Sequence, residues 1–368
     1  MAITFSNSNS LINEYQKYFS TKLLQHAIQL TVMDQFAIKQ PLPKKKGAKT
    51  ISFFRRTKST LNSNGRVAAV QSLTEGTPIS TFQYALLDRV DVNLVQYGEA
   101  AKITDIVSMT ELFDALKQNS DLMSEDCALN ADSIVRDALV SSSASGLSGG
   151  TAGVTLTQPA SAGDGTTTTT QETITQFYAQ GASNFAALNA LSQSGGKAVA
   201  TDFLRCATQL KINRAPTFNG MYVAVVPPQV SADLQNDPDW IDAANWGDPS
   251  RRFRGEIKNY AGCRFVEHTN PFTEDTAASS STREGYYAGS ATAANRAYRI
   301  FVLGMGAYGV PAIEGDSPFN PRVIIVNTPD KTDPLNQYMT AGWKAFWAAS
   351  GLNCPYAISL SAKSEFSS

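Results

Sequence analysis

A long helical pattern dominates the chain between Met109 and Ser143. Its row of mostly apolar residues advances in steps of three and four: Leu112, Leu116, Asn119, Met123, Cys127, Asn130, Ile134 and Ala138. A second row widens the predicted apolar stripe: Ala115, Leu122 and Leu129. Because neither Pro nor Gly interrupts this segment, we predict one spine helix of roughly 50 Å. The alternative is two core helices that break near Asn119–Ser120.

Two extended patterns precede this helix. Ile51–Lys58 is typical of a strand, and within Thr81–Lys102 the residues Val90, Val92 and Leu94 alternate with Asp91, Asn93 and Val95. We predict a long two-stranded ribbon with a loose, polar tip at 61–80. Because an isolated two-stranded ribbon is only marginally stable in water, it should lie on a larger surface.

The first 47 residues are predicted to form an N-terminal arm. Leu11–Ile38 has helical periodicity in places, and Pro41 and Pro43 end any helix. A short amphipathic helix of this kind cannot bury its stripe alone, so it needs a partner surface on the same chain or on another.

After the spine the composition changes twice. Ser141–Thr170 is rich in Ser, Gly and Thr and is predicted to be a surface insertion or loop. A mixed α/β pattern follows, which makes the fold class α+β. Its predicted elements are helices at Thr201–Arg214 and Gln229–Gln235, strands at Tyr222–Val226, Cys263–Val266, Tyr298–Leu303 and Val323–Val326, and a polar loop at Thr273–Arg296.

Composition limits the function classes. The 368 residues carry 31 Lys plus Arg and 32 Asp plus Glu, which argues against a dedicated nucleic-acid-binding protein. The four cysteines lie far apart without a C-x-x-C pair, which favours buried thiols over a disulfide or zinc framework. The polar start and the lack of a long apolar run predict neither a signal peptide nor a membrane helix.

The string G-x-S-x-G occurs at Gly146–Gly150. As a nucleophile elbow it needs an entering strand, a departing helix and a general base. Here a helix enters and a Ser/Gly-rich loop follows, and His26 and His268 are the only histidines. The context therefore argues against a serine hydrolase.

A second string, G-x-G-x-x-G, occurs at Gly304–Gly309 after a predicted strand. In a dinucleotide site its last glycine lies in a helix whose N-terminus binds the pyrophosphate. Pro311, Gly315 and Pro318 follow here and exclude such a helix, so we predict a turn between strands.

Carboxylates cluster at Asp237, Asp239 and Asp242. They could chelate a hard cation, but a helix start with Asp in its cap and first turn is the favoured interpretation. We therefore predict no catalytic, cofactor or metal site.

Positive charge is concentrated near the root of the ribbon. Gln35–Thr74 contains nine basic residues and no acidic one. We predict that the basic side chains of this run contact carboxylates of a neighbouring subunit, although contact with phosphate is the alternative. The candidate contacts are Lys44, Lys45, Lys46, Lys49, Arg55, Arg56, Lys58 and Arg66.

The order of arm, basic-rooted ribbon, spine and mixed domain resembles a tailed-bacteriophage major capsid protein of the Hong Kong 97 type, in particular the subfamily of some short-tailed phages. The similar strings lie between about Lys49 and Asn353. They are Phe82–Asp88 with Gln96–Gly98, Tyr222–Val230 with Asp233-Leu234, Gly255–Ile257 with Ala261–Glu267, Gly304–Gly309, and Gly342–Ala345.

The resemblance implies a division of the chain. It comprises an arm (1–47), an extended loop (48–108), a peripheral domain with the spine helix and surface insertion (109–195), an axial domain (196–322) and a C-terminal segment that returns to the core (323–368).

The resemblance also implies a function: self-assembly into the icosahedral shell around a phage's double-stranded DNA. The implied partners are copies of the chain in hexamers and pentamers, a portal, decoration or scaffolding proteins, and DNA in weak non-specific contact. The implied location is the virion, assembled in the host cytoplasm, with no cofactor and no membrane. A cellular nanocompartment shell of the same fold stays an alternative, followed by an enzyme or an adhesin.

Overall fold

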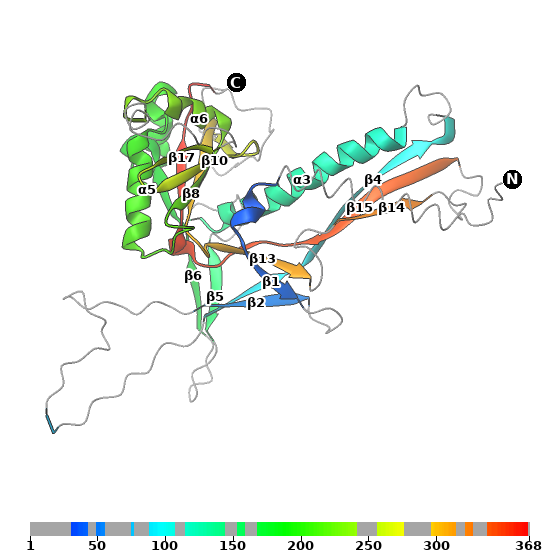
Figure 1. Ribbon diagram of the computed structural model, residues 1–368, viewed down its shortest axis with the longest axis horizontal. Coiled ribbons are helices and arrows are strands. Elements are labelled where there is room, and N and C mark those ends of the chain that lie inside the picture. The colour runs from blue at the N-terminus through cyan, green and yellow to red at the C-terminus, as the bar shows by residue number, and fades with distance from the viewer. Residues whose placement is uncertain are drawn as a thin grey trace.

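The computed structural model describes residues 31–42, 49–55, 75–76, 88–106, 115–143, 153–158, 168–240, 256–275, 296–313, 321–326 and 337–366. They form two parts: a block of sheet and helices at one end, and a slender limb at the other (Figure 1). The limb consists of α3 (Ala115–Ser141), β4 (Val95–Thr104), β14 (Arg322–Val326) and β15 (Tyr338–Trp347). Helices and strands are both present, so the α+β class is confirmed.

The block is built on a seven-stranded sheet in the order β7-β17-β12-β8-β10-β9, with β11 paired to β12. The strands are β7 (Thr175–Tyr178), β8 (Tyr222–Val226), β9 (Glu256–Tyr260), β10 (Cys263–Glu267), β11 (Phe272–Asp275), β12 (Arg296–Leu303) and β17 (Ala357–Ala362). The helices of the block are α4 (Phe185–Ala190), α5 (Ala200–Ile212) and α6 (Pro228–Gln235). The predicted strand at Tyr222–Val226 and the predicted helix at Thr201–Arg214 are thus confirmed.

Strand β8 lies at the centre of two cores. Tyr222, Ala224 and Val226 pack in a core with residues of α5 and α6. Val223 and Val225 point the other way, into a second core that includes residues of α3. Because both faces of the sheet are covered, the strand is apolar throughout and shows no alternation.

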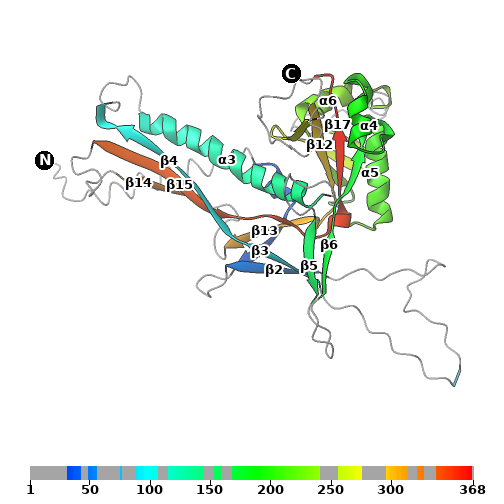
Figure 2. The ribbon, with the colours of Figure 1, turned by 180° about the vertical axis from the view of Figure 1, so that it is seen from behind.

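In the limb, α3 (Ala115–Ser141) is one continuous helix along the sheet β14-β15-β4 (Figure 2). The strands are β4 (Val95–Thr104), β14 (Arg322–Val326) and β15 (Tyr338–Trp347). The indole Nε1 of Trp347 donates a hydrogen bond to the Ala131 carbonyl at 3.2 Å. The spine prediction is confirmed from Ala115 onward, and the alternative with a break near Asn119–Ser120 is wrong. Residues 109–114 lie outside the described residues.

The helix buries a different stripe from the predicted one. Its buried apolar residues recur mainly every four positions: Met123, Cys127, Ala131, Val135 and Leu139. Leu122 and Leu129 are 60% and 45% exposed, so the predicted second row is wrong. The single sheet of the limb covers only one side of α3, and these two leucines face away from it.

The base of the predicted ribbon is confirmed, but its length is not. β2 (Thr50–Arg55) pairs antiparallel with β3 (Asp88–Asn93). The next strand, β4, instead pairs with β15 along all of its residues. β2 and β3 belong to a sheet with the order β2-β3-β5-β6, and Phe53 and Val90 are buried in the core of the same chain.

The segment predicted to be a loop contains two strands. β5 (Val154–Gln158) and β6 (Thr168–Glu172) form an antiparallel pair. Val154 and Leu156 are buried, so a Thr-rich composition here accompanies an alternating strand rather than a surface loop. Residues 144–152 and 159–167 lie outside the described residues.

The described part of the predicted arm packs on its own chain. A 3-10 turn, η1 (Met33–Phe36), precedes β1 (Ile38–Leu42), which pairs in parallel with β13 (Tyr308–Ile313). β13 also pairs with β16 (Ser350–Gly351). Pro41 is tolerated because β1 is an edge strand. The partner surface for residues 33–42 is thus intramolecular.

Candidate inter-subunit contact residues and buried polar clusters

The basic residues predicted to contact a neighbouring subunit separate into two groups. Lys49 precedes β2 and is exposed, and Arg55 ends β2. The others lie outside the described residues: Lys44, Lys45, Lys46, Arg56, Lys58 and Arg66.

Arg55 binds carboxylates of its own chain. Its Nη1 lies 2.6 Å from the Glu172 carboxylate, and its Nε lies 3.3 Å from that of Asp88. Nη1 also donates to the Leu352 carbonyl at 3.0 Å. Burial alone would lower the pKa of Arg55, but the hydrogen bond that its guanidinium donates to Glu172 and the charges of Glu172 and Asp88 raise the pKa overall. Arg55 therefore joins β2, β3 and β6, and an adjacent subunit is not needed to neutralise its charge.

A buried carboxylate on α3 connects three parts of the chain. Asp132 Oδ1 accepts a hydrogen bond from the Met33 backbone N–H at 2.9 Å, and Asp132 Oδ2 binds His268 Nε2. The Tyr308 hydroxyl donates to the Met33 carbonyl. Burial, with smaller effects from Asp132 and Asp34, raises the pKa of Tyr308. His268 thus binds a structural carboxylate, whereas Gly146–Gly150 and His26 lie outside the described residues.

Two arginines add further contacts between α3 and the block. Arg136 Nη1 donates to Asn270 Oδ1 at 2.7 Å. From β12, Arg299 Nη1 donates to Ser143 Oγ at 2.8 Å. Both arginines are buried. Because a buried charge is costly unless it is hydrogen-bonded, these contacts favour one fixed orientation of the limb against the block.

The Gly304–Gly309 string forms the predicted turn between β12 and β13, so that prediction is confirmed. Gly306 has a φ of +81°, which favours glycine. A Cβ at Gly309 would lie 2.8 Å from Leu352 Cδ1 and 3.0 Å from the Phe53 ring. These glycines serve a tight turn and close packing, not a phosphate.

The Asp237 carboxylate caps two chain segments. Asp237 Oδ2 accepts from the Ala200 N–H at 2.7 Å, at the start of α5, and its Oδ1 accepts from the Asp239 N–H at 3.2 Å. Asp242 lies outside the described residues. In the part of the chain that the structure describes, no group of three or more His, Cys, Asp or Glu side chains is placed to hold a metal ion.

All four cysteines are buried and unpaired, as predicted. Burial raises the pKa of each thiol, to about 12 for Cys263 and Cys354. No helix among the described residues has the length and apolar character needed to cross a membrane.

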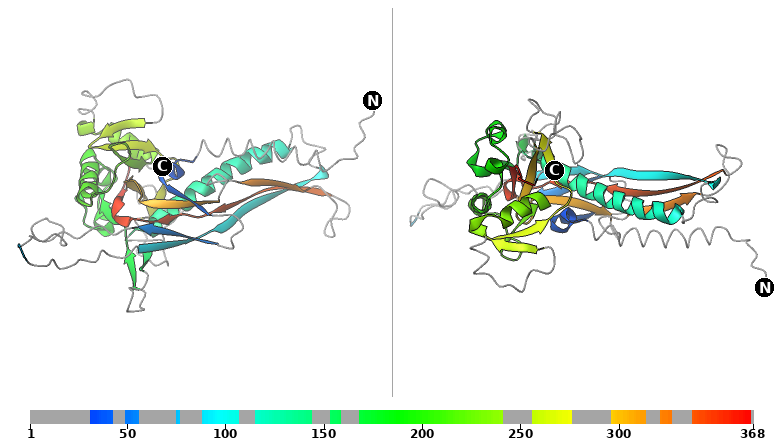
Figure 3. Two further views of the ribbon diagram at one scale, coloured as in Figure 1. Left: turned by 60° about the horizontal axis from the view of Figure 1, so that its bottom comes forward. Right: turned by 90° about the horizontal axis from the view of Figure 1, so that it is seen from above.

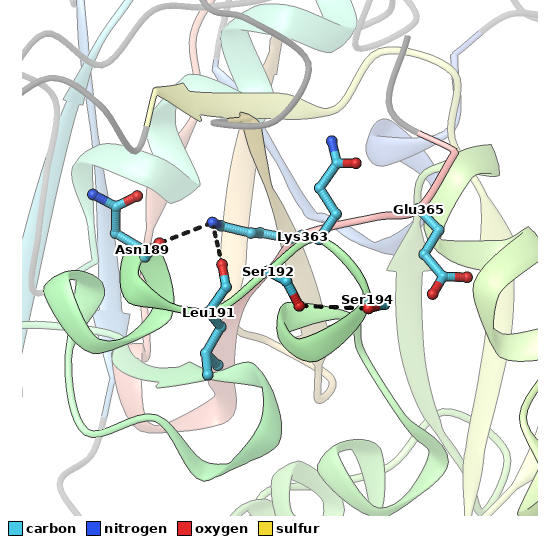
Figure 4. Close-up of a pocket in the computed structure, with 7 residues that line it drawn as sticks. Asn189, Leu191, Ser192, Ser194, Lys363 and Glu365 are labelled. Carbon is cyan, nitrogen blue, oxygen red and sulfur yellow. Dashed lines mark hydrogen bonds between the residues drawn. The ribbon is translucent and has the colours of Figure 1, made fainter.

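An open pocket of about 590 Å³ lies on the block between α4 and the C-terminal end of the described chain (Figure 4). Its lining includes Lys363, whose Nζ donates to the carbonyls of Asn189 and Leu191 at 3.0 and 2.8 Å. Burial lowers the pKa of Lys363. The amine binds carbonyls at the C-terminal end of α4, so it fastens that helix to the end of β17.

No family model and no curated protein sequence matches the chain. The capsid structure of cyanophage P-SCSP1u matches with a TM-score of 0.55 and 15% identity over 91% of this chain and 89% of its own. The capsid of Ralstonia phage GP4 matches with a TM-score of 0.55 and 15% identity, over 91% of this chain and 92% of its own. The acidic stable capsid structure of Helicobacter pylori bacteriophage KHP30 matches with a TM-score of 0.57 and 8% identity, over 91% of this chain and 90% of its own.

This chain has the fold of phage capsid proteins. The α+β capsid architecture expected from the sequence is thereby confirmed over about nine tenths of the chain. The division into five segments and the inter-subunit role of the basic run stay predictions.

Sequence reasoning missed most residues of these polar clusters. Asp132 was placed on the spine but had no visible partner, because His268 lies 136 residues away. Glu172 lies 117 residues from Arg55. Pairs this distant leave no local pattern. Asp132 lies on roughly the opposite side of the helix from the predicted apolar row, so the predicted periodicity offered no signal for its burial.

Proposed function

We propose that this chain is a bacteriophage major capsid protein that assembles with copies of itself into a closed icosahedral shell around double-stranded DNA. The observation that carries the proposal is the match to capsid structures over about nine tenths of both chains. The proposed role is structural rather than catalytic, and the proposed location is the virion, after assembly in the host cytoplasm.

The shape of the limb supports self-assembly. Its sheet has only three strands, with α3 on one face, and Ile324, Val326 and Phe346 are 46%, 46% and 42% exposed. Apolar side chains gathered on one open face are typical of a surface that another protein covers. A thin limb of this kind gains stability when neighbours bury it.

The charge balance supports a container rather than a DNA-binding protein. With 31 basic and 32 acidic residues, the chain has little net attraction for phosphate, so packaged DNA would be held weakly and non-specifically. Hexamers and pentamers of the chain, a portal, and scaffolding or decoration proteins complete the proposed set of partners.

The test is electron microscopy of the purified full-length chain, with and without an inert crowding agent. We expect closed shells built of hexamers and pentamers. A chain that stays monomeric in both conditions contradicts the proposal. Particles purified from the natural source should contain DNA, whereas protein cargo inside the shell would indicate a nanocompartment instead.

A further inference from the structure

The side of α3 that faces away from the sheet is acidic. Its exposed residues include Asp121, Leu122, Glu125, Asp126 and Leu129, and we call these five the acidic face. Among the described residues, none of its three carboxylates forms an ion pair. The one arginine on this helix, Arg136, is buried. The acidic face thus combines negative charge with two exposed leucines.

The opposite side of the limb is basic. Strand alternation and register place one set of residues on the sheet surface that faces away from α3, and we call this set the basic face: Lys102, Arg322, Ile324, Lys344 and Phe346. The residues that alternate with Lys344 and Phe346 along β15 are buried on the α3 side: Trp343, Ala345 and Trp347. Every charged residue that the register directs to this surface in β4, β14 and β15 is basic.

Two charges on the basic face repel each other. Arg322 and Lys344 are directly opposite in the antiparallel register of β14 and β15. Like charges in that arrangement destabilise a sheet. Lys102 lies over the Tyr338 ring at 3.6 Å and Lys344 lies 5.7 Å from the Phe346 ring, so within the described residues these amines contact aromatic rings. An acidic partner laid on this face would relieve the repulsion.

We propose that the acidic face of one copy of this chain docks on the basic face of the next copy. The inference rests on the proposed function and names the surfaces through which neighbouring subunits bind. Exposed leucines on one face and Ile324 and Phe346 on the other supply apolar contact, which a nucleic-acid partner would leave uncovered. The second copy supplies both the charge and the apolar surface that each face lacks.

The charge pattern also selects the symmetry of the contact. Two acidic faces repel each other and so do two basic faces, which excludes a symmetric two-fold pairing through either face. An acidic face on a basic face is attractive and head-to-tail. The two faces lie on opposite sides of the limb, so one copy can contact two neighbours at once (Figure 3).

The dimensions of the two faces are compatible. Lys344 is in register with Gly98, and Lys102 lies four residues further along β4, so the two amines are roughly 13 Å apart along the strand. On α3, the carboxylates from Asp121 to Asp126 cover roughly 8 Å of helix. If α3 of one copy lies along the sheet of the next, the carboxylates of the acidic face and the amines of the basic face can therefore meet in the same interface.

A charge exchange tests the proposal. The acidic-face variant carries Glu125→Lys and Asp126→Lys, and the basic-face variant carries Arg322→Glu and Lys344→Glu. Each alone should raise the threshold concentration for assembly roughly tenfold or more, because attraction becomes repulsion in two pairs. A chain carrying all four substitutions should assemble within roughly threefold of the wild type. Lys211→Glu, an exposed position on α5, is the control and should assemble normally.

Circular dichroism establishes that each variant is folded before assembly is scored. Normal assembly of both variants overturns the proposal, and so does failure of the four-substitution chain to recover. Complete shells that lack only DNA in the basic-face variant also overturn it, since the face would then bind nucleic acid. A wild-type chain that forms no shells contradicts the proposed function instead, so the two failures are distinguishable.

Cross-linking provides a second measurement. With Asp126→Cys and Phe346→Cys on one chain, a short bismaleimide should link the two faces of successive copies, while the native cysteines are buried. A head-to-tail contact predicts a ladder of dimers, trimers and larger species. Either single-cysteine variant should give no ladder. A band pattern that stops at the dimer in the two-cysteine chain would contradict head-to-tail docking.

Discussion

The Asp132 carboxylate on α3 accepts a hydrogen bond from the backbone N–H of Met33, which lies 99 residues earlier in the chain, at 2.9 Å. The same carboxylate binds His268, just beyond β10. One side chain therefore fastens the described part of the arm and the block to the limb. Because it is only 3% exposed, water cannot replace either contact.

Removing this carboxylate should destabilise the chain strongly. We expect Asp132→Ala to lower the free energy of unfolding by about 2–4 kcal/mol, since Met33 N–H and His268 lose their buried acceptor. Urea titration measures the loss, and hydrogen exchange should become faster at Met33–Phe36. Asp126→Ala, exposed on the same helix, should stay within about 0.5 kcal/mol of the wild type. Equal effects of the two substitutions would contradict the assignment.

Replacing Arg55 should lower the stability of the monomer, whatever its effect on assembly. We expect Arg55→Ala to cost about 3 kcal/mol, because Glu172 and Asp88 lose a partly buried partner. Lys49→Ala, at an exposed position just before β2, should be nearly neutral in thermal unfolding. An unchanged unfolding temperature in Arg55→Ala would refute the intrachain role. A test of the basic run in assembly should therefore replace Arg56 alone rather than Arg55 and Arg56 together.

Two truncations separate assembly from folding. Deleting residues 1–30 keeps buried Met33 and the whole of β1 and should therefore keep the stability that they supply, while complete shells fail to form. Deleting residues 1–42 removes buried Met33 and the whole of β1, and should lower stability by at least about 3 kcal/mol. Calorimetry of the monomers and electron microscopy of the assembled material give the two readouts. Normal shells after the shorter deletion would show that the first 30 residues are dispensable.

The sequence predicted elements whose partners are local or whose burial is complete. Helix α5 and strand β8 follow directly from periodicity and from a continuous apolar run. The pairing of β4 with β15, instead of with the strand predicted to form the ribbon, was not predictable in the same way. Residues 95–104 alternate equally well in either pairing. Register between distant strands depends on tertiary packing that no local pattern records.

In the candidate site, too, local features were predictable and long-range contacts were not. The concentration of positive charge before β2 is visible in the sequence, but the carboxylates that neutralise Arg55 lie 33 and 117 residues away along the chain. The burial of Leu122 and Leu129 was predicted from spacing alone, and their exposure depends on how narrow the covering sheet is. Hence periodicity identified the helix, and only packing identifies which side of it is free.

The last prediction concerns Lys363, which is 2% exposed and binds two backbone carbonyls. Burial lowers the pKa of this amine below its ordinary value, so the unfolded chain binds more protons than the folded chain between the two pKa values. The cost of burying the charged amine is therefore fully present at neutral pH. It disappears as the pH rises through the lowered pKa towards about 10.5.

Lys363→Met removes this titration. The free energy of unfolding of the wild type, relative to that of Lys363→Met, should therefore increase as the pH is raised from about 7 to about 10. Denaturant titrations of both chains across this range measure the difference. Lys211→Met, at an exposed position on α5, is titrated in parallel as the control for removing a lysine. A difference for Lys363→Met that does not change with pH would mean that burial does not perturb the amine.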